Sequence, residues 1–351
     1  MNCGCCCHCS NSQGALISFP WVPATTSTRG LGINSQQPQS ICWKISGNGT
    51  TMAIHPLIVR SARQGWRWQW LRLMGGLGPA DQGGHYRRPT STPMQTLVLG
   101  ERELEARDST TKPQLIVGRS CPWAHRVWLV FQLRGLSASI NLLMADADHD
   151  EGRWRLEPTW LGCDSLLDLY KLCGAPPSYR ATVPVLVDPG ACASDQPRLL
   201  GNDSTPLSEA LCSWPAEATA LNLAPSELKA SIASWQELIQ PSINDGVYRC
   251  GFARNQRAFD QASQALFSAL EQVEESLQTK GPWLCGEQLT LADVRLFPTL
   301  IRWEMVYAPL FGCSARPLWM FPALWGWRQR FFALAGVSES CNSQKWKRDY
   351  F

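Results

Sequence analysis

Apolar residues follow one pattern in the middle of the chain and another in its last third. Between residues 111 and 212, short apolar runs typical of strands alternate with runs that suit helices. This order, β-α-β followed by β-β-α, indicates a small α/β domain. Residues 145–163 are mostly polar and carry no predicted element. The strands are predicted at 113–118, 140–144, 182–188 and 198–201, and the helices at about 122–134, 164–172 and 205–212.

The last third of the chain is predicted to be all helical, after a linker at 213–223. A variant of the capping box at 290–293 signals the start of a helix. This helix is expected to reach Tyr307 with a bend near Pro298, and a last helix is expected at about 318–334. An earlier helix shows one apolar face in the three-to-four spacing of Phe259, Ala262, Leu266, Leu270, Val273 and Leu277.

The beginning of the chain lacks this regularity. Residues 1–51 are rich in Ser, Thr, Asn, Gln, Gly and Pro, and are expected to be disordered. We favour the interpretation that they are an extension outside the native protein, because Met52 begins a more protein-like stretch. Residues 52–110 are expected to form an arm and loops, with a short hairpin around 96–104. The basic, Trp-rich run at 58–74 is expected to pack on the folded body, although a membrane surface also suits it.

Composition and charge exclude several functional classes. The chain has 351 residues, of which 44% are hydrophobic and 17% charged, as in a globular protein with two ordinary domains. Residues 1–100 hold eight bases and one acid, a balance of +7, whereas 24 bases and 28 acids in the remainder give −4. The folded part is therefore not basic, and nucleic-acid binding is not expected. No run approaches the roughly 18 apolar residues of a membrane span, so stable membrane insertion is not expected either.

Cysteine usage indicates a reducing compartment. The fifteen cysteines lack the spacing of a disulfide framework, and no signal-peptide pattern precedes them. A cytoplasmic protein with free thiols is therefore expected. The cluster from Cys3 to Cys9, with His8, lacks the paired C-x₂-C spacing of a structural zinc site, so no metal is expected.

Candidate chemistry is concentrated at 120–126, Ser-Cys-Pro-Trp-Ala-His-Arg. Pro122 suits the first position of a helix, which places Cys121 at the N-cap, where unpaired N–H groups stabilise a thiolate and lower the thiol pKa. Arg126 is expected to add to this effect. Ala124 stands where a CxxC motif has its second cysteine, so the site is predicted to be monothiol and to need an outside thiol. The alternative is a buried cysteine that acts as a small hydrophobe.

Four motifs, in order, resemble those of the glutathionyl-hydroquinone reductases, also called Xi-class glutathione transferases. They lie at 121–126, 182–186, 244–253 and 299–307. The resemblance covers about residues 83–335 and implies an α/β domain followed by an all-α domain. The implied units are a thioredoxin-like glutathione-binding domain at 111–212, a linker at 213–223 and an all-helical substrate domain at 224–340.

The resemblance also implies roles for single residues. Cys121 would be the nucleophile, and Tyr248 and Tyr307 would face the quinone-derived ring. The implied glutathione-binding residues are Trp154, Val183, Pro184 after a cis peptide bond, Asp203 in a position usually held by Glu, and Ser204. Each of these roles has an alternative. Trp154 could be ordinary packing, Asp203 and Ser204 could simply cap a helix, and the two tyrosines could be core residues.

The implied activity is the glutathione-dependent reduction of glutathionyl-hydroquinones to hydroquinones. It would proceed through a mixed disulfide between Cys121 and glutathione and release oxidised glutathione. Glutathione would be a co-substrate, no metal would be needed, and a homodimer is expected. One alternative is a general glutathione thiol transferase or reductive dehalogenase that uses the same cysteine. Another is a non-catalytic binding module with the transferase fold.

Overall fold

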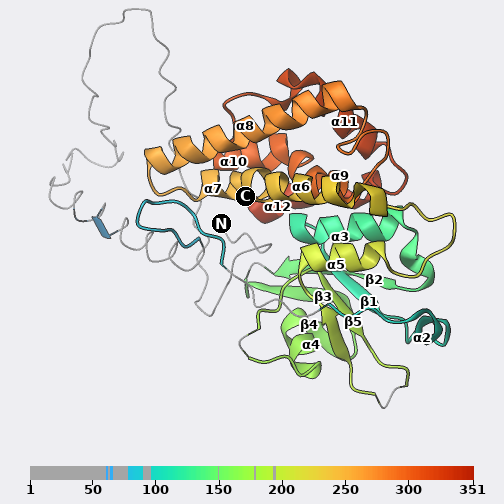
Figure 1. The fold of residues 1–351 in the computed structure, drawn as a ribbon. Coiled ribbons are helices and arrows are strands. Elements are labelled where there is room, and N and C mark those ends of the chain that lie inside the picture. Colours follow the sequence, from blue (N-terminus) through green and yellow to red (C-terminus); the bar gives the residue numbers. More distant parts are fainter. Residues whose placement is uncertain are drawn as a thin grey trace, which may run out of the picture. The chain divides into compact units, whose positions relative to one another are not determined.

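A computed structural model of the chain describes residues 61, 64–65, 78–89, 96–148, 150–177, 179–192 and 195–351. The predictions for 1–51, and most of those for 58–74, lie outside these residues. Residues 18–76 form a separate unit, of which only 61, 64 and 65 are described, all of them helical. From residue 78 onward the chain forms an α/β half followed by a helical half (Figure 1).

A six-stranded sheet in the order β4-β3-β2-β1-β5-β6 forms the centre of the α/β half. β1 runs parallel to β2, and every other neighbouring pair is antiparallel. Every residue of β1 and β5 is buried, which explains their continuous apolar runs. The strands are β1 (Gln114–Gly118), β2 (Asn141–Asp148), β3 (Arg153–Trp160), β4 (Cys163–Ser165), β5 (Val185–Asp188) and β6 (Arg198–Gly201).

No element was predicted in the polar stretch at 145–163. The structure shows the end of β2 there, followed by the hairpin of β3 and β4. In β3 only Trp154 and Leu156 are buried, so its sequence carries a short and weak alternation. The hairpin predicted around 96–104 is wrong. Its second part, Glu101–Glu105, forms helix α2, as its good helix formers favour.

Helix α3 (Pro122–Leu133) is enclosed by both halves of the protein. Ten of its twelve residues are buried, because the sheet covers one side and helix α9 (Leu291–Leu300) covers another (Figure 1). Pro122 holds the first helical position, and Gly135 follows the helix with a positive φ of 64°, as expected for a helix end. The other helices of this half are α4 (Leu166–Leu172) and α5 (Ser204–Cys212).

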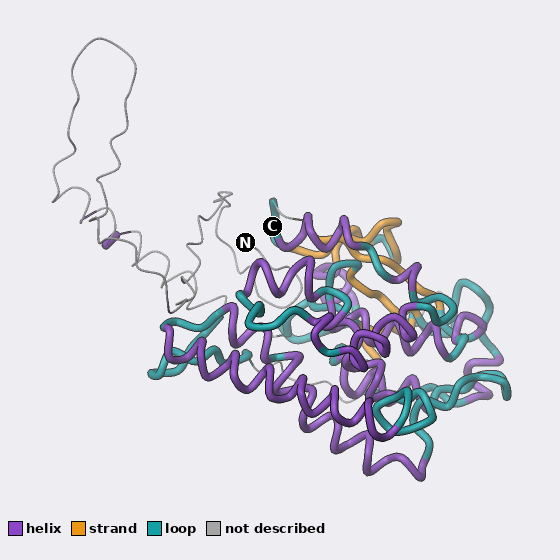
Figure 2. Tube along the Cα trace, turned by 90° about the horizontal axis from the view of Figure 1, so that it is seen from above, coloured by secondary structure: helices purple, strands orange, loops and turns teal. Residues whose placement is uncertain are grey.

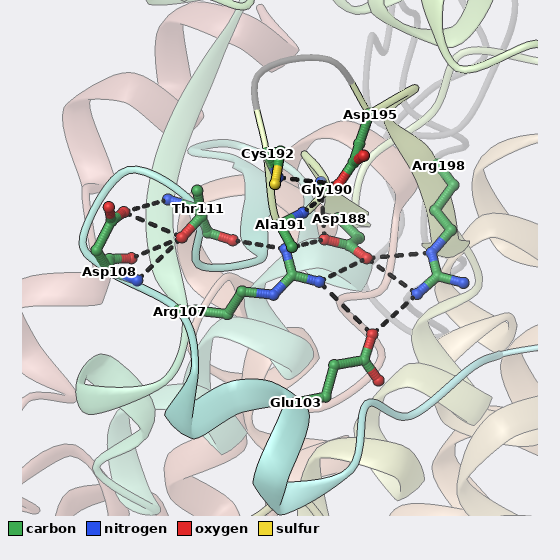
Figure 3. Close-up of polar contacts among 10 residues, drawn as sticks. All are labelled: Glu103, Arg107, Asp108, Thr111, Asp188, Gly190, Ala191, Cys192, Asp195 and Arg198. Carbon is green, nitrogen blue, oxygen red and sulfur yellow. Dashed lines mark hydrogen bonds and ion pairs between the residues drawn. The ribbon is translucent and has the colours of Figure 1, made fainter.

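An ion-pair network around the buried Asp188 fixes the end of the sheet that lies away from α3's first turn (Figure 3). Asp188, the last residue of β5, is 1% exposed and receives Arg107 at 3.1 Å and Arg198 at 3.0 Å. Glu103 of α2 lies 3.5 Å from Arg107 and 3.3 Å from Arg198. These contacts attach α2 to β5 and β6, so the network is a structural feature.

The helical half contains the predicted long helix α8. Helix α9 ends earlier than expected, and helix α11 begins later. The capping box at Thr290 and Asp293 is present, but α9 ends at Leu300, and a π-helical turn then leads to Tyr307. The predicted helix at 318–334 is α11, preceded by a 3₁₀ turn. The elements are α6 (Lys229–Ile239), η3 (Gln240–Asn244), α7 (Gly246–Gly251), α8 (Gln256–Lys280), α9, η4 (Trp303–Tyr307), α10 (Ala308–Phe311), α11 (Pro322–Phe332) and α12 (Ser343–Tyr350).

α12 was not predicted, because the expected last helix was α11. It contains only two large apolar residues, Trp346 and Tyr350, among charged neighbours, so no apolar stripe identifies it in the sequence. Residues 213–223 form neither a helix nor a strand. Within the described part of the chain, no helix is both long and apolar enough to cross a membrane.

Candidate active site

Cys121 lies where β1 ends and α3 begins. Its sulfur accepts a hydrogen bond from the backbone N–H of Ala124, with a nitrogen–sulfur distance of 3.5 Å, so Cys121 is the predicted N-cap. Its thiol also lies 3.8 Å from the carbonyl oxygen of Val183. The side chain is fully buried. The N–H of Ala124 faces the sulfur, and a hydrogen bond of this kind would stabilise a thiolate, which is consistent with the nucleophile predicted from the sequence.

Trp154 and Val183 come together over Gly118, three residues before Cys121. A Cβ atom at position 118 would lie 2.6 Å from the indole of Trp154 and 2.8 Å from the methyl group of Val183. Only glycine allows this close approach. Two of the residues predicted to hold glutathione therefore line the same end of the sheet as the cysteine.

The segment before β5 carries the cis peptide bond predicted between Val183 and Pro184. The hydroxyl group of Tyr170 donates a hydrogen bond of 3.0 Å to the carbonyl oxygen of Thr182. Burial raises the pKa of Tyr170 to about 12, so the phenol remains a donor at neutral pH. Tyr170 thus holds the approach to Val183 in place.

Asp203 and Ser204 lie at this same end of the sheet, because Gly201 at the end of β6 pairs with Leu186 near the start of β5. Asp203 is half-buried, and its Oδ1 accepts a 2.9 Å hydrogen bond from the N–H of Thr205. The capping role is therefore real for Asp203, and it uses one of the two carboxylate oxygens. Ser204 is the first residue of α5 and is buried.

Tyr248 and Tyr307 meet in the helical half. Their hydroxyl oxygens are 3.5 Å apart, and both side chains are buried. Tyr248 belongs to α7 and Tyr307 ends η4, so two separate motifs of the sequence converge here. The rings of Phe252 and Phe311 surround Tyr248, with centroid distances of 6.3 and 5.4 Å.

Trp123 connects the cysteine with the tyrosines. Its indole ring stacks on the phenol ring of Tyr248, and two guanidinium groups lie over the same indole, that of Arg88 at 3.7 Å and that of Arg126 at 4.2 Å. Arg88 is also paired with Asp245 at 2.6 Å. The predicted residues thus form two sets. One surrounds Cys121 in the α/β half, the other is the tyrosine cluster of Tyr248 and Tyr307 in the helical half, and Trp123 joins them.

Arg126 is a buried cation. Its Nη1 donates to Gln240 at 2.9 Å, whereas its Nε and Nη2 have no hydrogen-bond partner among the described residues. Burial lowers the pKa of Arg126 to about 9, which still leaves the guanidinium charged at neutral pH. The positive charge on the helix that carries Cys121 is consistent with the effect expected from the sequence.

Comparison with known proteins identifies the family. Residues 120–214 match the family model "Glutathione S-transferase, N-terminal domain", and residues 256–330 match "Glutathione S-transferase, C-terminal domain". The chain is 36% identical over 221 residues to the glutathionyl-hydroquinone reductase PcpF of Sphingobium chlorophenolicum, an alignment that covers 60% of this chain and 68% of the relative. The chain belongs to the Xi-class glutathione transferases, the glutathionyl-hydroquinone reductase family.

Solved structures agree with this assignment. The glutathione-bound structure of YqjG, a glutathione transferase homolog from Escherichia coli K-12, is 28% identical, with a TM-score of 0.62 over 70% of this chain and 80% of that chain. The Xi glutathione transferase of Phanerochaete chrysosporium is 26% identical, with a TM-score of 0.66 over 78% and 89%. The predicted fold class, a thioredoxin-like domain followed by an all-helical domain, is confirmed.

One residue that contacts the two predicted tyrosines was missed by the sequence analysis. The hydroxyl oxygen of Tyr350, in α12, lies 3.1 Å from that of Tyr248, and its ring meets that of Tyr307 edge-on. Figure 2 shows the C-terminal helix beside the strands. No local signal marks Tyr350, because its place at the site depends on how α12 packs.

The described residues contain no group of three or more His, Cys, Asp or Glu side chains placed to hold a metal ion. The cysteine cluster at 3–9 lies outside them.

Proposed function

We propose that this Xi-class transferase reduces glutathionyl-hydroquinones to hydroquinones with glutathione as co-substrate. The observation that carries the proposal is the position of Cys121, capping α3 and joined through Trp123 to Tyr248. A reactive sulfur on one side and phenols on the other are what the cleavage of an aryl–sulfur bond needs.

In the first step the Cys121 thiolate attacks the sulfur of the glutathionylated ring. The new bond is the disulfide between Cys121 and glutathione, and the bond that breaks joins sulfur to the ring carbon. The ring carbon leaves with the electron pair and takes a proton, for which Tyr248 and Tyr307 are the donors in this proposal. Free hydroquinone is the first product.

In the second step a second glutathione thiolate attacks the glutathione sulfur of the mixed disulfide. Oxidised glutathione leaves and the Cys121 thiolate returns. The two steps together consume one glutathione and transfer two electrons to the ring carbon. No metal or nucleotide takes part in this scheme.

The glutathione contacts are proposed from the placement of five residues. The backbone of Val183, before Pro184, lies beside the cysteine and can pair with the peptide of glutathione as an added strand would. Ser204, at the start of α5, can bind the γ-glutamyl carboxylate. Asp203 can receive the ammonium group and Trp154 can cover the ligand.

The state of the protein in the cell is also proposed from the family. We expect a homodimer, for which light scattering would give twice the chain mass of 39.1 kDa. We expect a cytoplasmic location, where glutathione is reduced and abundant, which fractionation with an antibody would test.

The test is the intact mass of the protein after exposure to a glutathionylated hydroquinone without added glutathione. We expect one glutathione on Cys121 and free hydroquinone in solution, with no adduct in C121S. The variant C192S is the matched control, because Cys192 is exposed and follows the end of β5 that lies away from Cys121. If no adduct forms although Cys121 reacts with an alkylating probe, a disulfide transferase is the better conclusion. If Cys121 does not react with the alkylating probe either, a non-catalytic binding module with the transferase fold is the better conclusion.

A further inference from the structure

Helix α12 reaches both sets of residues at the candidate site from one face. Trp346 and Tyr350 are four residues apart, so their side chains lie one above the other on the same side of the helix. The indole N–H of Trp346 donates to the carbonyl oxygen of Arg119 at 3.2 Å, and the hydroxyl of Tyr350 meets that of Tyr248 at 3.1 Å. One turn of α12 therefore spans the distance between the turn at 118–121, which precedes the thiol, and the tyrosine cluster of Tyr248 and Tyr307.

The carbonyl group that Trp346 holds belongs to the turn that presents the thiol. The N–H of Cys121 donates to the carbonyl oxygen of Gly118 at 3.1 Å, which closes a four-residue turn. Its central peptide joins Arg119 to Ser120, and turns of different types differ in the direction of that peptide. A donor on the Arg119 carbonyl oxygen fixes this direction and hence the position of Cys121 at the N-cap.

Trp346 is itself held firmly. It is 1% exposed, and the guanidinium of Arg302 lies over its ring at 4.0 Å. Nη1 of Arg302 donates to the carbonyl oxygen of Pro298 and contacts Nδ1 of His125, both at 2.9 Å. Because arginine only donates, Nδ1 is the acceptor and His125 is neutral, and burial together with Arg302 lowers its pKa.

Ion pairs join the same helix to the sheet. Nζ of Lys345 lies 3.2 Å from Asp146, near the end of β2, and Asp146 also lies 3.6 Å from the guanidinium of Arg119. Helix α12 thus contacts the turn directly at the Arg119 carbonyl group and is linked to the Arg119 side chain through Asp146. A helix packed only for burial would not need a donor directed at this carbonyl group.

We propose that Trp346 is a positioning residue, whose N–H fixes the turn before Cys121 and so sets the thiol relative to the tyrosine cluster. This inference rests on the proposed function only in taking Cys121 as the nucleophile. The placement of the sulfur itself can be measured without the substrate.

The test uses W346F, which keeps an aromatic ring over Arg302 and removes the N–H. We expect kcat for a glutathionyl-hydroquinone to fall about tenfold with KM within about twofold, because misplaced reacting atoms lower the rate more than the binding. We also expect the rate of Cys121 alkylation by iodoacetamide to change by at least about threefold. The matched control is W325F, whose ring also carries a guanidinium, that of Arg328 at 4.1 Å, but lies on α11.

Two further comparisons keep the test decisive. If W346F does not fold, benzothienylalanine at position 346 removes the N–H and keeps the bicyclic shape. If wild-type protein has no reductase activity, the proposed function fails, while the alkylation rates of W346F and W325F still decide this inference. Equal alkylation rates in wild type, W346F and W325F would overturn it, whatever happens to kcat.

Discussion

The indole ring of Trp123 stacks on the phenol ring of Tyr248, with ring centroids 6.0 Å apart and planes inclined by 29°. Trp123 is two residues from Cys121, and Tyr248 lies in the helical half of the chain. The relation between thiol and phenol is therefore set by a direct ring contact. A flat substrate ring bound beside this contact would meet sulfur from one half and hydroxyl groups from the other.

The phenol hydroxyls are expected to matter for one class of substrate and not for another. Y248F removes a proposed proton donor, so kcat for a glutathionyl-hydroquinone should fall by about 10²-fold. Reduction of a small glutathione mixed disulfide should hardly change, because its leaving thiolate needs no proton. Y350F should have a smaller effect of the same kind, since Tyr350 contacts the hydroxyl of Tyr248. Equal losses on both substrates would show that the phenols act on the cysteine or on glutathione.

Gly118 is expected to be intolerant of a side chain. In G118A the new methyl group meets Trp154 and Val183 well inside contact distance, so both must shift. We expect the free energy of unfolding to fall by about 1–3 kcal/mol. We also expect glutathione affinity, measured by calorimetry, to fall about tenfold, which corresponds to about 1.4 kcal/mol.

The control for this variant is G326A, inside α11, where no atom lies within 4 Å of the added Cβ. It should be unchanged or more stable by about 0.5–1 kcal/mol, with the affinity of the wild type. A G118A protein that binds glutathione normally would remove Trp154 and Val183 from the proposed binding site.

His85 should make the attachment of segment 78–88 dependent on pH. Its Nε2 lies 2.7 Å from the amide oxygen of Gln261, and its Nδ1 lies 3.2 Å from Asp81. Both partners are acceptors, so the ring that donates from both nitrogens is favoured, and these hydrogen bonds, Gln261 first, raise the pKa of His85. The stabilisation is complete below the ordinary histidine pKa and is lost as pH rises through the raised value.

Hydrogen exchange measures this attachment. We expect protection factors in segment 78–88 to fall as the pH rises above the ordinary histidine pKa of about 6.5, and to be independent of pH in H85Q. Constant protection in the wild type over this rise in pH would contradict the assignment of the switch to His85.

Asp293 is expected to be essential for the stability of the helical half. Its buried carboxylate accepts from the N–H of Leu284 and of Thr290, both at 3.0 Å, and from the indole N–H of Trp327 at 2.9 Å. D293N turns an amide NH₂ toward these donors, so urea unfolding should show a loss of about 3 kcal/mol. D260N, on the exposed face of α8, should stay within about 0.5 kcal/mol of the wild type.

Local signals predicted the parts of the site that depend on local structure. The proline after Cys121 fixes the start of α3 without help from distant residues, and the capping box does the same for α9. β3 was missed because only Trp154 and Leu156 alternate with polar neighbours. Tyr350 was missed for a different reason: it reaches Tyr248 only through the packing of α12, which involves Arg119, Asp146 and Arg302 far away in the sequence.

The enclosure of α3 has a consequence for how the chain folds. Its buried residues belong to the core of the sheet on one side and to the core of the helical half on the other. The two family domains therefore share a hydrophobic core, and neither is complete alone. They should melt in one calorimetric transition, and residues 111–212 expressed by themselves should expose the outer side of α3 and aggregate.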